Sequence, residues 1–161
     1  MAIKLVIFDC DHTLWEHHDV AATRPPFRRL DQDTVEDARG DRVRLFPGAR
    51  EVLEALRARG IKISIASWNL PEIVFQIFEA LGLMDYFMRP KVEFHPRKDR
   101  MIASLLGELA ADGIALRPEE VLFVDDRQVM LETVRQALGP IRTLQAGVDI
   151  SDLRDVLAHL D

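Results

Sequence analysis

The strongest constraint on the fold is an alternation of short apolar runs with segments of helical periodicity. Runs rich in β-branched residues occupy 3–8, 61–66, 121–124 and 141–145, with a weaker one near 86–92. Apolar residues recur at helical spacing over 48–59, 71–81, 99–111, 128–138 and 150–160. Such alternation is typical of a parallel sheet with helices on both faces. We therefore predict an α/β fold with a doubly wound, Rossmann-like parallel sheet.

Proline and glycine mark the ends of the first two predicted helices. Pro47 precedes the segment 48–59 and Gly60 follows it, as helix boundaries prefer. Asn69 is placed to cap the second helix, Pro71 lies in its first turn, and Gly82 follows its last residue. These boundaries place a short polar segment between the second strand and its helix.

Length and composition narrow the class of protein. A chain of 161 residues fits a single domain, here predicted over 1–161. One cysteine, Cys10, cannot form an internal disulfide or a thiolate metal cluster. The net charge of −6 lacks the basic footprint of nucleic-acid binders, and no apolar run is long enough to span a membrane. We expect a cytoplasmic protein that binds neither nucleic acid nor membranes, and the sequence does not predict its oligomeric state.

Residues 15–46 interrupt the alternation and directly follow the first strand and its acidic loop. The segment holds six arginines and seven acidic residues, and it contains the pair Pro25-Pro26. We predict a small cap-like insertion that overhangs the functional site. A hairpin is expected over 34–46, with its turn at 39–41.

Acidic and polar residues follow three of the predicted strands. Asp9 and Asp11 come after the first, Ser67 after the second, and Asp125 and Asp126 after the fourth. Ligands of parallel sheets bind at the carboxyl ends of the strands. Two carboxylates so close together repel each other in a dry site, and a divalent cation such as Mg²⁺ relieves that repulsion. Taken alone, Asp9 and Asp11 are equally compatible with surface acids that cap a strand or a helix.

Four motifs in order carry a resemblance to a known superfamily. Residues 9–14, Asp-Cys-Asp-His-Thr-Leu, look like the first motif of the haloacid dehalogenase-like hydrolases, Asp-x-Asp-x-Thr. Ser67 matches the second motif, Lys98 the third, and Asp125-Asp126 the acidic fourth. The agreement runs along nearly the whole chain, so the resemblance implies the fold of this superfamily.

The insertion narrows the resemblance to one family. It resembles the magnesium-dependent phosphatases, which carry a minimal cap, through Leu14-Trp15, Pro25-Pro26-Phe27, Thr34-Val35, Asp37, Arg39-Gly40 and Leu45-Phe46-Pro47. The resemblance implies a Mg²⁺-dependent phosphomonoesterase. Its substrate would be a phosphotyrosine-type aryl phosphate, small or within a phosphoprotein, or a small sugar phosphate, and the sequence does not choose between them.

The resemblance also implies roles for the acids. Asp9 would be the nucleophile that forms a phosphoaspartyl intermediate. Asp11 would protonate the leaving group and then activate the hydrolytic water. Mg²⁺ would bridge Asp9, the backbone carbonyl of Asp11 and an acid of the fourth motif, with Asp126 favoured over Asp125.

The remaining implied roles concern the phosphate. Ser67 and the backbone amides near Trp68 and Asn69 would bind it at a helix start, and Lys98 would neutralise developing charge. Cys10 would belong to the phosphate-binding loop through its backbone, because a thiol phosphatase needs an arginine six residues later and position 16 is glutamate.

Several alternatives stay open from the sequence. His12 stands where many superfamily members have glycine, and it either shapes specificity or fills the loop. The tract 17–19, His-His-Asp, is either solvated or faces the substrate. A non-catalytic module that binds phosphate or a partner would use the same fold. A phosphoacceptor receiver fits less well, because receivers usually place the hydroxyl and the lysine after later strands.

Overall fold

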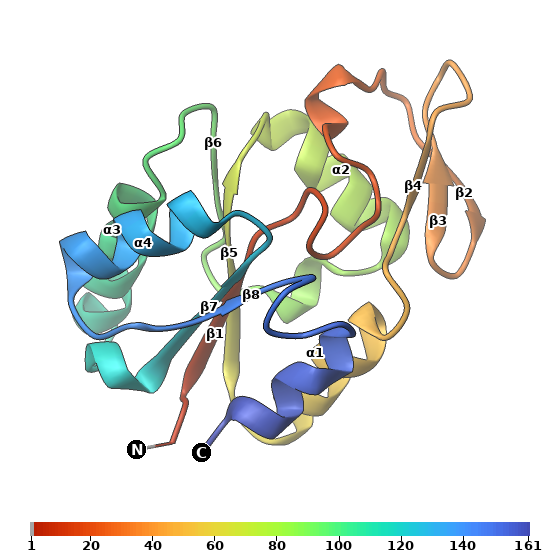
Figure 1. Cartoon of the computed structure of the whole chain (residues 1–161). Helices are drawn as coiled ribbons and strands as arrows, with labels where there is room; N and C mark the ends of the chain where they lie inside the picture. Colours follow the sequence, from red (N-terminus) through yellow and green to blue (C-terminus); the bar gives the residue numbers. More distant parts are fainter. Residues whose placement is uncertain (1) are drawn as a thin grey trace.

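The computed structural model describes residues 2–161 and is built on one sheet of five parallel strands (Figure 1). In spatial order these are β6 (Lys91–Glu93), β5 (Lys62–Trp68), β1 (Leu5–Phe8), β7 (Val121–Asp125) and β8 (Arg142–Gln145). Every neighbouring pair is parallel. The predicted doubly wound α/β fold is confirmed.

The first strand, β1, lies at the centre of the sheet and is fully buried. Its side chains alternate between two apolar cores, with Val6 and Phe8 in one and Leu5 and Ile7 in the other. Each core is covered by helices, which explains why the strand is apolar at every position. None of the helices formed by residues 2–161 has the length and apolarity needed to cross a bilayer.

The helices lie in two layers (Figure 1). The core that holds Val6 and Phe8 takes side chains from α1 (Ala49–Ala58) and α2 (Pro71–Leu81). The opposite core takes them from α3 (Lys98–Ala111) and α4 (Gln128–Leu138). All four helices agree with the predicted segments to within one or two residues. Amphipathic periodicity located them because each buries one stripe against the sheet.

The weaker predicted elements differ from the observed ones. The strand expected near 86–92 is β6 at Lys91–Glu93, preceded by the 3₁₀ helix η2 (Met84–Tyr86). The helix expected over 150–160 is the 3₁₀ helix η4 (Leu153–His159). Its buried residues Leu153 and Val156 are three apart, which is the repeat of a 3₁₀ helix. The short 3₁₀ helix η3 (Pro118–Glu120) leads into β7.

The insertion after β1 forms a small antiparallel sheet that follows the 3₁₀ helix η1 (Val20–Ala22). Its strands are β2 (Arg28–Asp31), β3 (Thr34–Glu36) and β4 (Arg42–Arg44). The predicted hairpin is confirmed as β3 and β4, where the buried residues Val35 and Val43 face each other. Strand β2 was not predicted, because all four of its residues are exposed and show no alternation.

The insertion is anchored to the main domain through Arg50 of α1. Its guanidinium donates to the Asp33 carboxylate at 3.2 Å and to the carbonyl oxygens of Gln32 and Leu81 at 2.7 and 2.8 Å. One side chain therefore joins the turn between β2 and β3 to the end of α2. This ties the small sheet to a helix that packs on the central sheet.

Candidate active site

The predicted site residues meet where the order of the strands reverses. From β1 the chain first adds β5 and β6 on one side, and it later adds β7 and β8 on the other. Asp9 follows β1, whereas Asp125 and Asp126 lie at the end of β7. Lys98 begins α3, after β6. This edge is the switch point at which doubly wound sheets bind ligands.

Lys98 is the centre of the cluster. Its Nζ donates to Asp9 Oδ1 at 2.7 Å and to Asp125 Oδ2 at 2.6 Å, and the residue is only 3% exposed. Burial alone would lower the pKa of Lys98, but the attraction of Asp9 and Asp125 outweighs it and raises the pKa. The side chain therefore stays protonated and holds two buried carboxylates together.

The second oxygen of Asp9 is also held. The Thr13 hydroxyl donates to Asp9 Oδ2 at 3.1 Å and lies 3.4 Å from Asp126 Oδ1. Thr13 reaches this position because the backbone turns tightly, with the N–H groups of Thr13 and Leu14 both donating to the carbonyl oxygen of Cys10. The spacing of the motif therefore fixes the plane of the Asp9 carboxylate.

Three carboxylates lie close together around the ammonium group of Lys98 and the hydroxyl of Thr13. Oxygens of Asp9, Asp125 and Asp126 all lie within 4.8 Å of one another. Burial and the charge of Asp9 raise the pKa of Asp125 to about 7, against the opposing attraction of Lys98. Burial and Asp9 likewise raise the pKa of Asp126 to about 6. When all three acids are ionised, three carboxylates and one ammonium leave two unbalanced negative charges, which is the charge that one divalent cation offsets.

The donor set fits Mg²⁺, which prefers a few carboxylate oxygens. Both oxygens of Asp125 already have partners, because Oδ2 accepts from Lys98 and Oδ1 accepts from the backbone N–H of Arg127 at 2.9 Å. Asp126 has no such ion pair and is half-buried. This difference supports Asp126 over Asp125 as the metal ligand beside Asp9, and the assignment stays a prediction.

Asp11 lies at the edge of the cluster, in a separate hydrogen-bond network. Its Oδ1 accepts from Trp15 Nε1 at 2.8 Å and its Oδ2 accepts from Asn69 Nδ2 at 3.0 Å. Burial raises the pKa of Asp11, while the Trp15 hydrogen bond opposes that rise. A carboxyl group whose pKa is raised holds a proton closer to neutral pH, as a general acid requires.

The residues expected to bind phosphate are only partly placed as predicted. Trp68 lines the cavity beside Asp9, but Ser67 is buried against Cys10 and is not among the described residues that line it. The expectation for the Asn69 amide is wrong, because its N–H donates to the carbonyl oxygen of Glu93 at 3.0 Å. Strand pairing between β5 and β6 explains this, since it extends to Trp68 and Glu93.

The thiol of Cys10 has no access to a substrate. The residue is fully buried in the apolar core. Burial, with the charges of Asp9 and Asp11, raises the pKa of the thiol. A buried thiol with a raised pKa is a poor nucleophile, which argues against a thiol phosphatase mechanism at Cys10, and a role of its backbone in binding phosphate stays a prediction.

The cluster opens into a cavity of about 520 Å³. That volume is in the range of cavities that bind small molecules. The insertion contributes His18, Asp19 and Ala21 to the wall. Sequence reasoning missed three further lining residues, which follow the carboxyl ends of β6 and β7: Phe94, Arg127 and Met130. The strand-end rule that found the acids would have found these too.

A family model described as acid phosphatase matches residues 1–154. The chain belongs to the acid phosphatase family. Human magnesium-dependent phosphatase 1 is 37% identical over 90 residues, which cover 55% of this chain and 51% of the human protein. The match therefore spans about half the length of that relative. It confirms the resemblance to the magnesium-dependent phosphatases.

Solved structures support the fold of this acid phosphatase family member. A haloacid dehalogenase superfamily hydrolase from Ehrlichia chaffeensis superposes with a TM-score of 0.69 and 16% identity, covering 99% of this chain and 96% of that one. The N-terminal phosphatase domain of a Bacteroides fragilis protein, solved with Mg, gives a TM-score of 0.67 and 19% identity, over 99% of this chain and 40% of that one. At these identities the likeness establishes the haloacid dehalogenase-like fold.

His12 lies within the first motif and has an unusual backbone conformation. Its φ is +56°, in the left-handed region that glycine enters at little cost. A glycine at this position would adopt the same backbone conformation with less strain. The imidazole packs edge-on against Phe46 at 5.6 Å between ring centres and lines the cavity, so the side chain both fills the loop and forms part of the wall.

Proposed function

We propose that the protein is a Mg²⁺-dependent phosphatase of the haloacid dehalogenase type, which hydrolyses phosphate monoesters through a phosphoaspartyl intermediate on Asp9. The observation that carries the proposal is the buried contact of Lys98 with Asp9 and Asp125 at the floor of an open cavity. The names of the relatives agree, since one is a magnesium-dependent phosphatase and another is a phosphatase domain with bound Mg.

In the first step an oxygen of Asp9 attacks phosphorus, and the bond from phosphorus to the ester oxygen breaks. Lys98 and Thr13 hold the Asp9 carboxylate, so little motion is needed to aim it. Asp11 gives its proton to the departing oxygen. The products of this step are the free alcohol or phenol and an acyl phosphate on Asp9.

In the second step Asp11, now ionised, takes a proton from a water molecule that attacks phosphorus. The bond between phosphorus and the Asp9 oxygen breaks, which releases inorganic phosphate and restores both carboxyl groups. Asp11 lines the same cavity as Asp9, as both steps require. Lys98 remains charged throughout and stabilises the negative charge that develops nearby.

Mg²⁺ would be held by Asp9, Asp126 and the backbone carbonyl of Asp11. When bound, it supplies positive charge that offsets the repulsion between Asp9 and a phosphate dianion. The unbalanced charge of the buried acids supports this role, because those acids repel each other when they are ionised together.

For the substrate, we propose either a phosphotyrosine-type aryl phosphate or a small sugar phosphate. Trp68 and Phe94 give the cavity aromatic surface, while His18 and Asp19 give it polar groups, so both classes have suitable contacts. We also propose that residues 15–46 act as a small cap within a single domain, because His18, Asp19 and Ala21 of this segment line the cavity.

The decisive experiment is hydrolysis of 4-nitrophenyl phosphate by the purified chain, with MgCl₂ and with EDTA. We expect turnover that requires Mg²⁺. A chain that binds inorganic phosphate in the presence of Mg²⁺ but turns over no ester in a broad panel would instead be a non-catalytic binding module, and the proposal would be wrong.

Mg²⁺ affinity should fall at low pH. The metal binds ionised carboxylates, and the pKa values of Asp125 and Asp126 are raised to about 7 and about 6. Protons therefore compete with the metal in this range, and we expect binding at pH 5.5 to be about tenfold weaker than at pH 8, with proton release. Calorimetric titration in two buffers measures both quantities. Equal affinity at the two pH values would contradict the prediction.

A further inference from the structure

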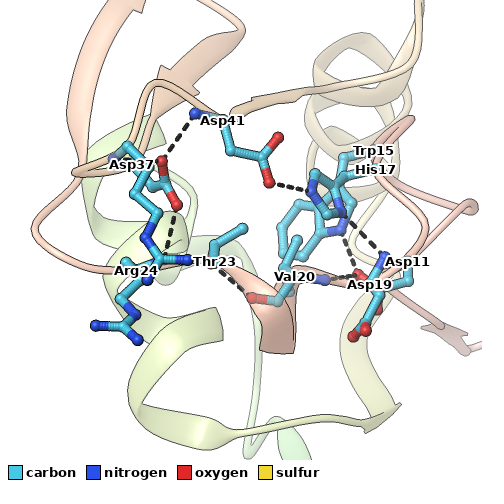
Figure 2. A network of polar contacts seen from close by, with 10 residues as sticks. Asp11, Trp15, His17, Asp19, Val20, Thr23, Arg24, Asp37 and Asp41 are labelled. Carbon is cyan, nitrogen blue, oxygen red and sulfur yellow. Dashed lines mark hydrogen bonds and ion pairs between the residues drawn. The ribbon is translucent and has the colours of Figure 1, made fainter.

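The carboxylate of Asp11 accepts hydrogen bonds from two parts of the chain, the start of the insertion and the residue that follows β5. Oδ1 accepts from the indole N–H of Trp15 at 2.8 Å and from the backbone N–H of Val20 at 3.4 Å. Figure 2 shows these two contacts. Oδ2 accepts from the Asn69 amide at 3.0 Å. None of these donors takes part directly in the proposed proton transfers.

The contacts distinguish the two oxygens of Asp11. Oδ1 accepts from two donors, whereas Oδ2 accepts from one. A carboxyl oxygen has two lone pairs, so Oδ2 keeps the capacity to carry a transferable proton. The two shorter hydrogen bonds, from Trp15 and Asn69, act on opposite oxygens, and they therefore also prevent rotation of the carboxyl group about its Cβ–Cγ bond. Asp11 is thus oriented before any substrate binds.

Trp15 and Asn69 are themselves held in place by further contacts. Trp15 is fully buried, bridges to Asp11 and Leu45 through its backbone, and packs on Phe78 at 5.7 Å between ring centres. Asn69 is 1% exposed, and its Oδ1 accepts the N–H of Leu70 at 3.0 Å. That bond settles which end of the amide faces Asp11. Neither donor can leave without breaking other contacts.

The insertion supports the third donor. His17 Nδ1 accepts the backbone N–H of Asp19 at 3.0 Å, so the ring carries its proton on Nε2 and donates it to Asp41 at 2.9 Å (Figure 2). The N–H of His12 also donates to the carbonyl oxygen of His17 at 3.0 Å. The turn that presents Val20 to Asp11 is therefore hydrogen-bonded both to the hairpin, through Asp41, and to the first motif, through His12.

We propose that Trp15 and Asn69 are positioning residues, which hold Asp11 so that Oδ2 delivers its proton to the leaving group. The proposal rests on the proposed phosphatase function. It assigns to the start of the insertion and to the end of β5 a task separate from binding phosphate. Proton delivery matters most when the leaving group is basic, so the role has a signature in the dependence on the leaving group.

The test compares kcat/KM for 4-nitrophenyl phosphate, whose leaving group needs little protonation, with that for phenyl phosphate. For Trp15→Phe and for Asn69→Ala we expect the loss on phenyl phosphate to exceed the loss on 4-nitrophenyl phosphate by about tenfold or more. The loss should appear in kcat. Asn69→Asp is a second variant at this position, which keeps an acceptor for Leu70 but removes the donor to Asp11.

Phe78→Leu is the matched control, because Phe78 packs on Trp15 without any polar contact to Asp11. Its loss should be equal on both substrates. Equal losses for the Trp15 and Asn69 variants would overturn the positioning role while leaving the phosphatase function standing. A wild-type chain that hydrolyses neither substrate would overturn the proposed function, and the positioning role with it.

Discussion

Replacing Asp9 with asparagine should abolish hydrolysis of 4-nitrophenyl phosphate, with a loss in kcat of about 10⁴-fold or more. An amide is a poor nucleophile and cannot form the acyl phosphate that the mechanism requires. The fold should survive, because Lys98 keeps its contact with Asp125 and the cluster loses one of three mutually repelling charges. We therefore expect an inactive protein whose thermal stability is at least that of the wild type.

Asp112→Asn is a suitable control for this change, since Asp112 is an exposed acid whose partner is Arg89. It should retain full activity. A direct measurement is also available, because hydroxylamine or borohydride traps an acyl phosphate on wild-type Asp9 and should find none in Asp9→Asn. If Asp9→Asn kept activity within tenfold of wild type, the assignment of the nucleophile would be wrong.

Lys98→Met should destabilise the protein by about 3–5 kcal/mol at pH 8, in addition to removing activity. The substitution leaves Asp9 and Asp125 buried without their cation. The penalty depends on pH. The pKa of Asp125 is already raised to about 7 in the fold, against about 3.9 for an unfolded aspartate, and it rises further without Lys98. The folded state then binds more protons than the unfolded state, so stability falls as pH increases through this window.

Urea unfolding of Lys98→Met and wild type at pH 5 and pH 8 measures this effect, with a larger difference expected at pH 8. Lys91→Met is the matched control, because Lys91 pairs with Glu108 away from the cluster. Its loss should be smaller and similar at the two pH values. Mg²⁺ should stabilise Lys98→Met more than wild type, because the metal then offsets charges that Lys98 no longer balances. A loss that is the same at both pH values would contradict the explanation.

The parts of the fold that were predictable are those in which local pattern and burial coincide. Strands β1 and β7 are apolar at nearly every position because helices cover both faces of the sheet, and such runs are visible in the sequence. Strand β2 was not predictable, since its exposed residues are held by backbone pairing with β3. Nor was the 3₁₀ form of η4, whose conformation depends on packing against the rest of the fold.

In the site too, the positions of residues could be predicted but their contacts could not. The acids could be located because each follows a strand at one edge of the sheet, whereas Lys98 could be located only through its match to the third motif of the superfamily. Their pairing could not be derived, because the distances from Lys98 to Asp9 and Asp125 depend on how three segments pack. Asn69 is the clearest example. Its position after β5 is visible in the sequence, but its backbone N–H donates to Glu93 of β6 and its side-chain amide donates to Asp11.

The central place of β1 has a consequence for the order in which the protein is completed during synthesis. The first strand is made earliest, yet one of its two neighbours, β7, begins at residue 121. Lys98 lies 89 residues after Asp9, and Asp126 lies 113 residues after Thr13. A nascent chain that ends before β7 has Asp9 but lacks the acids that complete the cluster. If Mg²⁺ binds this cluster as proposed, its binding reports that the sheet has closed around β1, and such long-range pairing makes this a late event in folding.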